Sequence, residues 1–100
     1  MRVRVLSSAL KDLSAGREFY DRQEEGIGDY FFDSVFADID SLRLYGGIHR
    51  KIFGFHRILA RRFPYAIYYK MSFEGMVVVH RVLDCRRDPA RIRRALKSSE

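Results

Sequence analysis

The sequence predicts an α+β domain in which an N-terminal strand and a two-helix hairpin join a mostly antiparallel sheet of three to four strands, with a short C-terminal helix as an optional last element. Three observations lead to this prediction. Apolar residues recur at helical spacing through the first half of the chain. Three runs rich in aromatic and β-branched residues follow, separated by short turns. The 100 residues, 47% of them hydrophobic, suffice for one core, so residues 1–100 are expected to form a single domain.

The first predicted elements are a short strand and a helix. Residues 2–6 (RVRVL) alternate charged and apolar side chains, as a strand with one buried face does. Ser7 and Ser8 carry hydroxyls that can cap the start of a helix. This helix is expected to run to about residue 23, and its buried stripe is predicted to consist of Ala9, Leu13, Gly16 and Tyr20.

A second helix is expected to begin near Asp29, after a turn marked by Gly26 and Gly28, and to end at residues 45–47 (YGG). Its acidic residues fall on a different side from its apolar ones. This separation indicates a solvated face rather than a metal or acid–base site. The predicted apolar face consists of Phe32, Val35, Ile39 and Leu42, and the acidic side of Asp29, Asp33 and Asp40.

The second half of the chain predicts strands. Residues 54–60, 64–71 and 76–83 are the three runs, and their short connections imply antiparallel neighbours. The near-continuous apolar run of the last strand indicates a central strand covered on both sides. One face is predicted to hold Val77, Val79, Arg81 and Leu83, and the other Val78, His80 and Val82. Pro89 then opens a basic segment, residues 90–97, that suits a terminal helix.

The net charge of +6 is unevenly distributed. Residues 1–50 contain 7 Lys/Arg and 9 Asp/Glu, whereas residues 51–100 contain 12 and 4. A basic surface made by the second half would attract nucleic acid or an acidic protein segment.

Cysteine usage and hydropathy bear on the compartment and on bound groups. A single cysteine, Cys85, fits a reducing cytoplasm, and no signal peptide or membrane span of about 20 apolar residues is present. The three histidines, His49, His56 and His80, have no metal-ligand spacing. We therefore expect a cytoplasmic protein without membrane association, metal or cofactor.

Two stretches carry a family resemblance: RFPYAIYY (residues 62–69) and VVVHRVLDCRRDP (residues 77–89). In this order and spacing they resemble the ParE/RelE superfamily, the toxins of type II toxin–antitoxin systems, also known from plasmid stabilisation. The resemblance implies a growth-inhibiting bacterial protein neutralised by a cognate antitoxin, whose acidic, apolar C-terminal segment wraps the toxin. It implies contact with DNA only through that antitoxin, and either DNA gyrase or the ribosome as the target.

The residues favour the gyrase-directed type over the nuclease type. In the ribosome-dependent nucleases of this superfamily, the resemblance implies two alternate basic residues at the positions of Arg57 and Leu59. It also implies an arginine at the position of Ala66, another at Arg86, and an aromatic general acid near Ile92. Only two of these five positions hold a suitable residue, although acid–base cleavage of RNA needs several. We therefore predict a non-enzymatic, ParE-like gyrase inhibitor, with a RelE-like mRNA endoribonuclease as the alternative.

Arginines are the candidate contact residues because planar guanidinium groups bind phosphates or carboxylates bidentately. The candidates for contact with the target or the antitoxin are Arg57, Arg81, Arg86, Arg87 and Arg91, and Asp88 is expected to pair with Arg86 or Arg87. An apolar antitoxin groove, flanked additionally by Arg93 and Arg94, would be marked by exposed residues among Phe31, Phe36, Ile48 and Phe53. A second alternative is a non-catalytic nucleic-acid-binding module that stacks bases on Tyr65, Tyr68 and Tyr69.

Overall fold

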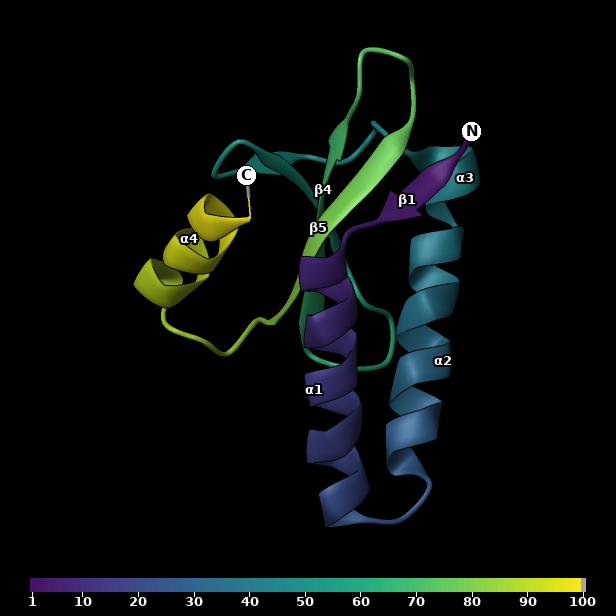
Figure 1. The fold of residues 1–100 in the computed structure, drawn as a ribbon, viewed down its shortest axis with the longest axis vertical. Helices are drawn as coiled ribbons and strands as arrows, with labels where there is room; N and C mark the ends of the chain where they lie inside the picture. Colours follow the sequence, from purple (N-terminus) through teal and green to yellow (C-terminus); the bar gives the residue numbers. More distant parts are fainter. Residues whose placement is uncertain (100) are drawn as a thin grey trace.

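The computed structural model describes residues 1–99 and shows the predicted α+β architecture, a helical hairpin on a mostly antiparallel sheet (Figure 1). The elements, in chain order, are β1 (Val3–Val5), α1 (Ser7–Gln23), α2 (Ile27–Asp40), α3 (Leu42–Tyr45), β2 (Lys51–Ile52), β3 (Phe55–Leu59), β4 (Tyr65–Met71), β5 (Val77–Asp84) and α4 (Pro89–Ser98).

The sheet has five strands in the order β1-β5-β4-β3-β2, whereas three to four were predicted. The additional strand is β2, which is two residues long and pairs with β3 across a tight turn formed by Phe53 and Gly54. A strand this short has no periodicity that a sequence pattern can reveal. Strand β1 pairs with β5 in parallel, whereas the other neighbours are antiparallel.

The helices cover both faces of this sheet. On one face, α1 and α2 lie side by side, and their apolar residues pack on alternate residues of β4 and on β5. On the other face, Ile92 and Leu96 of α4 pack on Phe55, Tyr68 and Leu83. Strand β5 is therefore central and covered on both sides, as predicted (Figure 1).

The predicted alternation along β5 is wrong after Val79. Tyr69 of β4 pairs with Val79, whereas its neighbour Tyr68 pairs with Arg81, so His80 is an extra residue in β5. Such a bulge shifts the following side chains to opposite faces. Val82 therefore packs under the helical hairpin with Val79, and Leu83 packs under α4.

The starts of the first two helices also differ from the prediction. Neither Ser7 nor Ser8 caps α1, whose N-cap residue is Leu6. The Ser8 hydroxyl instead donates a hydrogen bond to the carbonyl oxygen of His80 at 2.6 Å. Helix α2 begins at Ile27, close to the predicted start near Asp29, and directly follows Gly26, which has a left-handed conformation (φ 94°).

Close packing between α1 and α2 depends on Gly16. A Cβ atom at this position would lie 2.5 Å from the ring of Phe31, which is fully buried. Contacts between Phe31 and the rings of Tyr20, Phe63 and Tyr65 restrict its movement. The predicted buried stripe of α1 is confirmed for its first three residues, Ala9, Leu13 and Gly16. The predicted acidic side of α2 is exposed, as expected.

None of the helices within residues 1–99 combines the length and apolar character that crossing a membrane requires.

Candidate functional site

Three of the five candidate arginines gather where β5 ends. Arg57 on β3 lies opposite Tyr68 of β4, and burial raises the pKa of the Tyr68 hydroxyl while Arg57 opposes this effect. Arg57 and Arg86 are both close enough to Cys85 to influence its ionisation, although burial, the dominant effect, raises the pKa of that thiol. Arg87 follows directly and is exposed. The structure therefore brings guanidinium groups from β3 and from the segment after β5 to one end of the sheet.

Asp84 fixes the orientation of Arg86. The Nε and Nη2 atoms of Arg86 donate to the two carboxylate oxygens of Asp84 at 2.9 and 2.7 Å, and its backbone N–H donates at 2.8 Å. These hydrogen bonds lower the pKa of Asp84, and the carboxylate in turn raises the pKa of Arg86. The Arg86 side chain remains 60% exposed, so the pair presents an oriented cation to solvent.

The predicted pairing of Asp88 with an arginine is wrong. Its carboxylate accepts a hydrogen bond from the backbone N–H of Ala90 at 3.1 Å and caps α4, with Pro89 in the first turn. An aspartate directly before a helix is a favoured N-cap residue. The acidic partner of Arg86 is instead Asp84.

Arg81 is turned inward and is not part of the exposed group. Its Nε and Nη2 atoms donate to Asp12 of α1 at 2.7 and 2.9 Å, and its Nη1 donates to the carbonyl oxygen of Ala95 in α4 at 2.9 Å. The side chains of Arg81 and Asp12 are only 18% and 11% exposed. The hydrogen bonds that Arg81 donates to the Asp12 carboxylate raise the pKa of Arg81. Arg81 thus connects α1, β5 and α4.

The positions that correspond to the nuclease set hold side chains that cannot transfer a proton. Leu59 is 55% exposed on β3, Ala66 is fully buried in β4, and Ile92 is 7% exposed in α4. Of the expected set only Arg57 and Arg86 are present, and an arginine side chain stays protonated in proteins. This end of the sheet can therefore bind anions but has no evident general acid or base among those positions.

Sequence analysis missed a cluster of two imidazoles and a phenol. The Tyr69 hydroxyl lies 2.5 Å from Nδ1 of His49 and accepts a hydrogen bond from the backbone N–H of Gly47 at 2.9 Å. The ring of His56 stacks on Tyr69 with centroids 5.0 Å apart. Burial lowers the pKa of His49, and the neighbouring His56 adds to the effect. No sequence signal places these residues together, because the turn between β2 and β3 brings them into contact.

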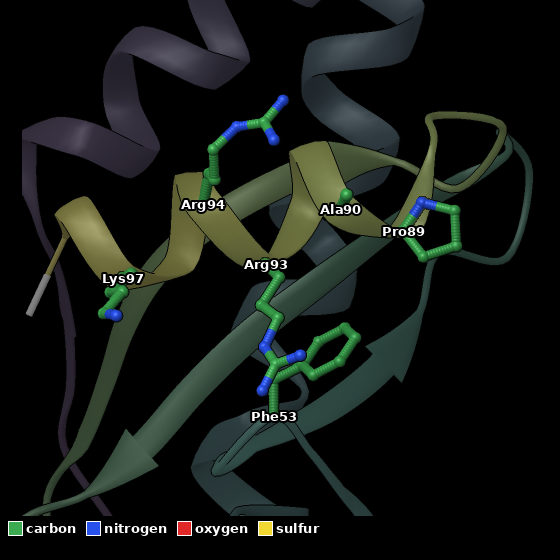
Figure 2. Close-up of a pocket in the computed structure, with 6 residues that line it drawn as sticks. All are labelled: Phe53, Pro89, Ala90, Arg93, Arg94 and Lys97. Carbon is green, nitrogen blue, oxygen red and sulfur yellow. The ribbon is translucent and has the colours of Figure 1, made fainter.

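A groove lies between α4 and the turn that joins β2 to β3 (Figure 2). It encloses about 500 Å³ and is lined by Phe53, Pro89, Ala90, Arg93, Arg94 and Lys97. The Arg93 guanidinium lies over the Phe53 ring, 5.6 Å from its centroid. The prediction of an exposed apolar surface holds for Phe53 (45% exposed), whereas Phe31 belongs to the core.

The other candidate apolar residues, Phe36 and Ile48, are 40% and 74% exposed. The remaining candidate arginine, Arg91, is exposed in the first turn of α4. Within residues 1–99, no group of three or more histidine, cysteine or acidic side chains is arranged to hold a metal ion.

The comparisons with known proteins concern the fold. No protein-family profile matches the chain. No curated protein matches it. Among solved structures, the fold is similar to that of a chain described as "Chromosomal ParDE TA system from P. aeruginosa", with a TM-score of 0.73 and 15% sequence identity over 82% of this chain and 92% of that chain. The expected fold is thereby confirmed: this chain has the fold of a component of a ParDE system.

Proposed function

We propose that this chain is the toxin of a type II toxin–antitoxin pair, that it is ParE-like and inhibits DNA gyrase, and that a cognate antitoxin neutralises it. The observation that carries the proposal is the fold similarity to a ParDE system chain, which extends over 82% of this chain and 92% of the other. The resemblance of residues 62–69 and 77–89 to the same superfamily supports it independently, because it rests on local sequence and not on the fold.

The site favours binding over catalysis. A nuclease must deprotonate a 2′-hydroxyl and protonate a leaving oxygen, and the positions expected for these roles hold Leu59 and Ile92. Arg57 and Arg86 can bind phosphate or carboxylate but do not exchange protons near neutral pH. A RelE-like endoribonuclease would need a different catalytic set.

We propose Arg57, Arg86, Arg87 and Arg91 as contacts to the target or the antitoxin. Arg86 is held in place by Asp84, so less conformational freedom is lost when a partner binds. Arg81 is a positioning residue in this proposal, because Asp12 and the Ala95 carbonyl occupy its donors.

A non-catalytic module that stacks nucleic-acid bases is disfavoured. Its proposed stacking residues, Tyr65, Tyr68 and Tyr69, are 9%, 1% and 0% exposed. Base stacking requires an open aromatic face, and the packing of these rings in the two cores removes it. We expect contact with DNA only through the antitoxin.

Induction of the chain alone in a bacterial host tests the proposal. We expect growth inhibition with DNA double-strand breaks, altered plasmid supercoiling and intact mRNA, and relief when the gene encoded beside it is induced as well. Ribosome-associated mRNA cleavage would instead establish the nuclease alternative. Purified gyrase, assayed for supercoiling with and without the chain, separates direct inhibition from secondary DNA damage.

A pair of variants tests the arginine contacts. Arg86→Gln with Arg87→Gln removes two charges but keeps side-chain donors near Asp84, and it should relieve the growth inhibition without unfolding the protein. The control, Lys11→Gln with Arg22→Gln, removes the same charge from exposed positions on α1. Equal toxicity of the folded test and control variants would contradict the assignment.

A further inference from the structure

The segment that leads from α3 into β2 is attached to the sheet mainly through polar contacts. None of residues 46–52 is fully buried, and Ile48, the large apolar residue at its centre, is 74% exposed. Strand β2 itself is two residues long and lies at the edge of the sheet. A segment with so little buried apolar surface opens locally at a low cost in free energy. Its position therefore depends on the hydrogen bonds that hold it.

Tyr69 of β4 provides the first of these bonds. Its hydroxyl oxygen accepts from the backbone N–H of Gly47 at 2.9 Å and lies 2.5 Å from Nδ1 of His49. Within residues 1–99, His49 is the one acceptor that this hydroxyl contacts, so the Tyr69 proton points to Nδ1. The imidazole of His49 must then be neutral, with its own proton on Nε2.

His56 of β3 provides the second bond. Its Nδ1 lies 2.6 Å from the backbone carbonyl oxygen of His49. A carbonyl oxygen only accepts, so Nδ1 of His56 carries a proton. The ring of His56 also stacks on Tyr69, with centroids 5.0 Å apart. The ring and the carbonyl of His49 are thus both bound to the sheet.

Protonation of His49 is incompatible with this arrangement. An imidazolium has two N–H donors and no acceptor, so the Tyr69 hydroxyl, which is fully buried, loses the acceptor of its proton. The surroundings do not favour the charged form either, because burial lowers the pKa of His49 and His56 lowers it further. The cations that follow in the chain, Arg50 and Lys51, are exposed, and within residues 1–99 no carboxylate pairs with His49.

The same segment leads into the groove beside α4. Phe53 directly follows β2 and lines the groove, where Figure 2 shows Arg93 reaching from α4 to the Phe53 ring. The φ of Phe53 is 55°, a conformation that a bulky residue keeps only where the surrounding structure holds it. That structure is the β2–β3 pairing, in which the Arg57 N–H donates to the Arg50 carbonyl at 3.0 Å. Loss of the His49 contacts therefore frees the turn to relax.

We propose that His49 and Tyr69 form a pH-sensitive latch: protonation of His49 opens residues 46–53 away from the sheet and removes the Phe53 wall of the groove. The inference goes beyond the proposed function, because it concerns the conformation of the free chain and assigns no ligand. Its sign follows from the protonation states. His49 binds a proton more readily in the open form, so the open form gains population as the pH falls from about 6.5 towards the lower pKa of His49 in the closed form.

Nuclear magnetic resonance of the ¹⁵N-labelled chain tests the latch. At pH 7.5, long-range ¹H–¹⁵N correlations should show a neutral His49 with its proton on Nε2. Hydrogen exchange of the Gly47 and Arg57 amides, corrected for intrinsic exchange rates, gives the opening constant of the segment. Between about pH 7.5 and 5.5 this constant should rise about fivefold to tenfold, tenfold being the limit for uptake of one proton over this range. It should be nearly independent of urea below about 1 M, because local opening exposes little surface.

Three variants separate the latch from a general effect of acid. His49→Gln keeps an acceptor for the Tyr69 hydroxyl but cannot be protonated, so its opening constant should change less than about twofold over the same range. The matched control, His80→Gln, removes an imidazole from β5 and should keep the wild-type response. Tyr69→Phe should raise the opening constant about tenfold already at pH 7.5, because two hydrogen bonds are lost, and should respond less to pH. Circular dichroism establishes that each variant is folded.

A proton on Nδ1 of His49 at pH 7.5 would overturn the inference, as would a pH response that survives in His49→Gln or disappears in His80→Gln. Wild-type opening in folded Tyr69→Phe would do the same, and so would an opening constant that rises steeply with urea, since the event would then be global unfolding. If His49→Gln does not fold, the wild-type tautomer and Tyr69→Phe decide the question. None of these measurements depends on growth or on gyrase, so the latch and the proposed function can fail separately.

Discussion

Replacing Asp12 by alanine tests the role of the buried ion pair. The substitution leaves Arg81, 18% exposed, without its carboxylate partner, and removes the acceptor of the Val82 backbone N–H, which donates to Asp12 Oδ2 at 2.9 Å. Breaking a buried pair by removing one partner costs about 3–5 kcal/mol, and the remaining access of Arg81 to solvent lowers this to about 3 kcal/mol. For a domain of this size the melting temperature should fall by about 15 °C.

Thermal and urea unfolding followed by circular dichroism measure this loss. Asp33→Ala, which removes an exposed aspartate from α2, is the control and should change stability by less than about 0.5 kcal/mol. Asp12→Leu combined with Arg81→Met should be more stable than Asp12→Ala, because no unpaired charge remains. A cost of less than about 1 kcal/mol for Asp12→Ala, or a double variant that is the least stable of the set, would show that the ion pair does not have this stabilising role.

Three further predictions concern packing, pH and reactivity. Gly16→Ala should destabilise the protein by about 1–2 kcal/mol in urea unfolding, because the added Cβ meets Phe31 and outweighs the gain in helix propensity; equal or higher stability would contradict it. Since burial lowers the pKa of His49 below its ordinary value of 6.5, the unfolded chain binds protons more readily, so stability should fall as the pH drops below about 6.5 and this dependence should weaken in His49→Gln. Cys85 is exposed to solvent, but partial burial of its thiol raises the pKa and lowers the thiolate fraction, so its alkylation at pH 8 should be slower than that of a model thiol and should reach the model rate in denaturant.

The sequence contains enough information for the layers of the fold. The helical stripe that includes Leu13 and the apolar run of β5 are long, regular patterns, and both are buried as predicted. The bulge at His80 is different, because the residues before it (Val77, Val78 and Val79) and the residues after Arg81 (Val82 and Leu83) are all apolar and show no alternation that a bulge could interrupt. Where a strand is covered on both faces, hydrophobicity carries no information about register.

The role of Asp12 shows why part of the site could not be predicted. On α1 it resembles an ordinary exposed charge, yet β1 reaches only as far as Val79 along β5. Beyond that point Ser8 donates to the carbonyl of His80 and Asp12 accepts from the N–H of Val82, so two side chains one turn apart replace the missing strand. This role of Asp12 depends on where β1 ends along β5, which is a feature of the tertiary structure and cannot be read from the sequence.

The exposure of each candidate arginine also depends on tertiary contacts. By residue type and by proximity to the end of β5, Arg81 and Arg86 are equally good candidates for a contact residue. They differ in where their acidic partners come from. The carboxylate that binds Arg81 comes from another layer and buries it, whereas the carboxylate that binds Arg86 lies two residues away and leaves it 60% exposed. A local ion pair orients a cation at the surface, and a long-range pair removes it from the surface.

The electrostatics of α4 affect the stability of the free chain. Arg91, Arg94 and Lys97 follow one another at intervals of three residues, and Arg93 precedes Lys97 by four, so like charges are neighbours along the helix. Each such pair opposes helix formation by about 0.2–0.5 kcal/mol, or roughly 1 kcal/mol for the three pairs together. The cationic surface therefore destabilises the free chain slightly, and added salt should raise the stability of the free chain because it screens this repulsion.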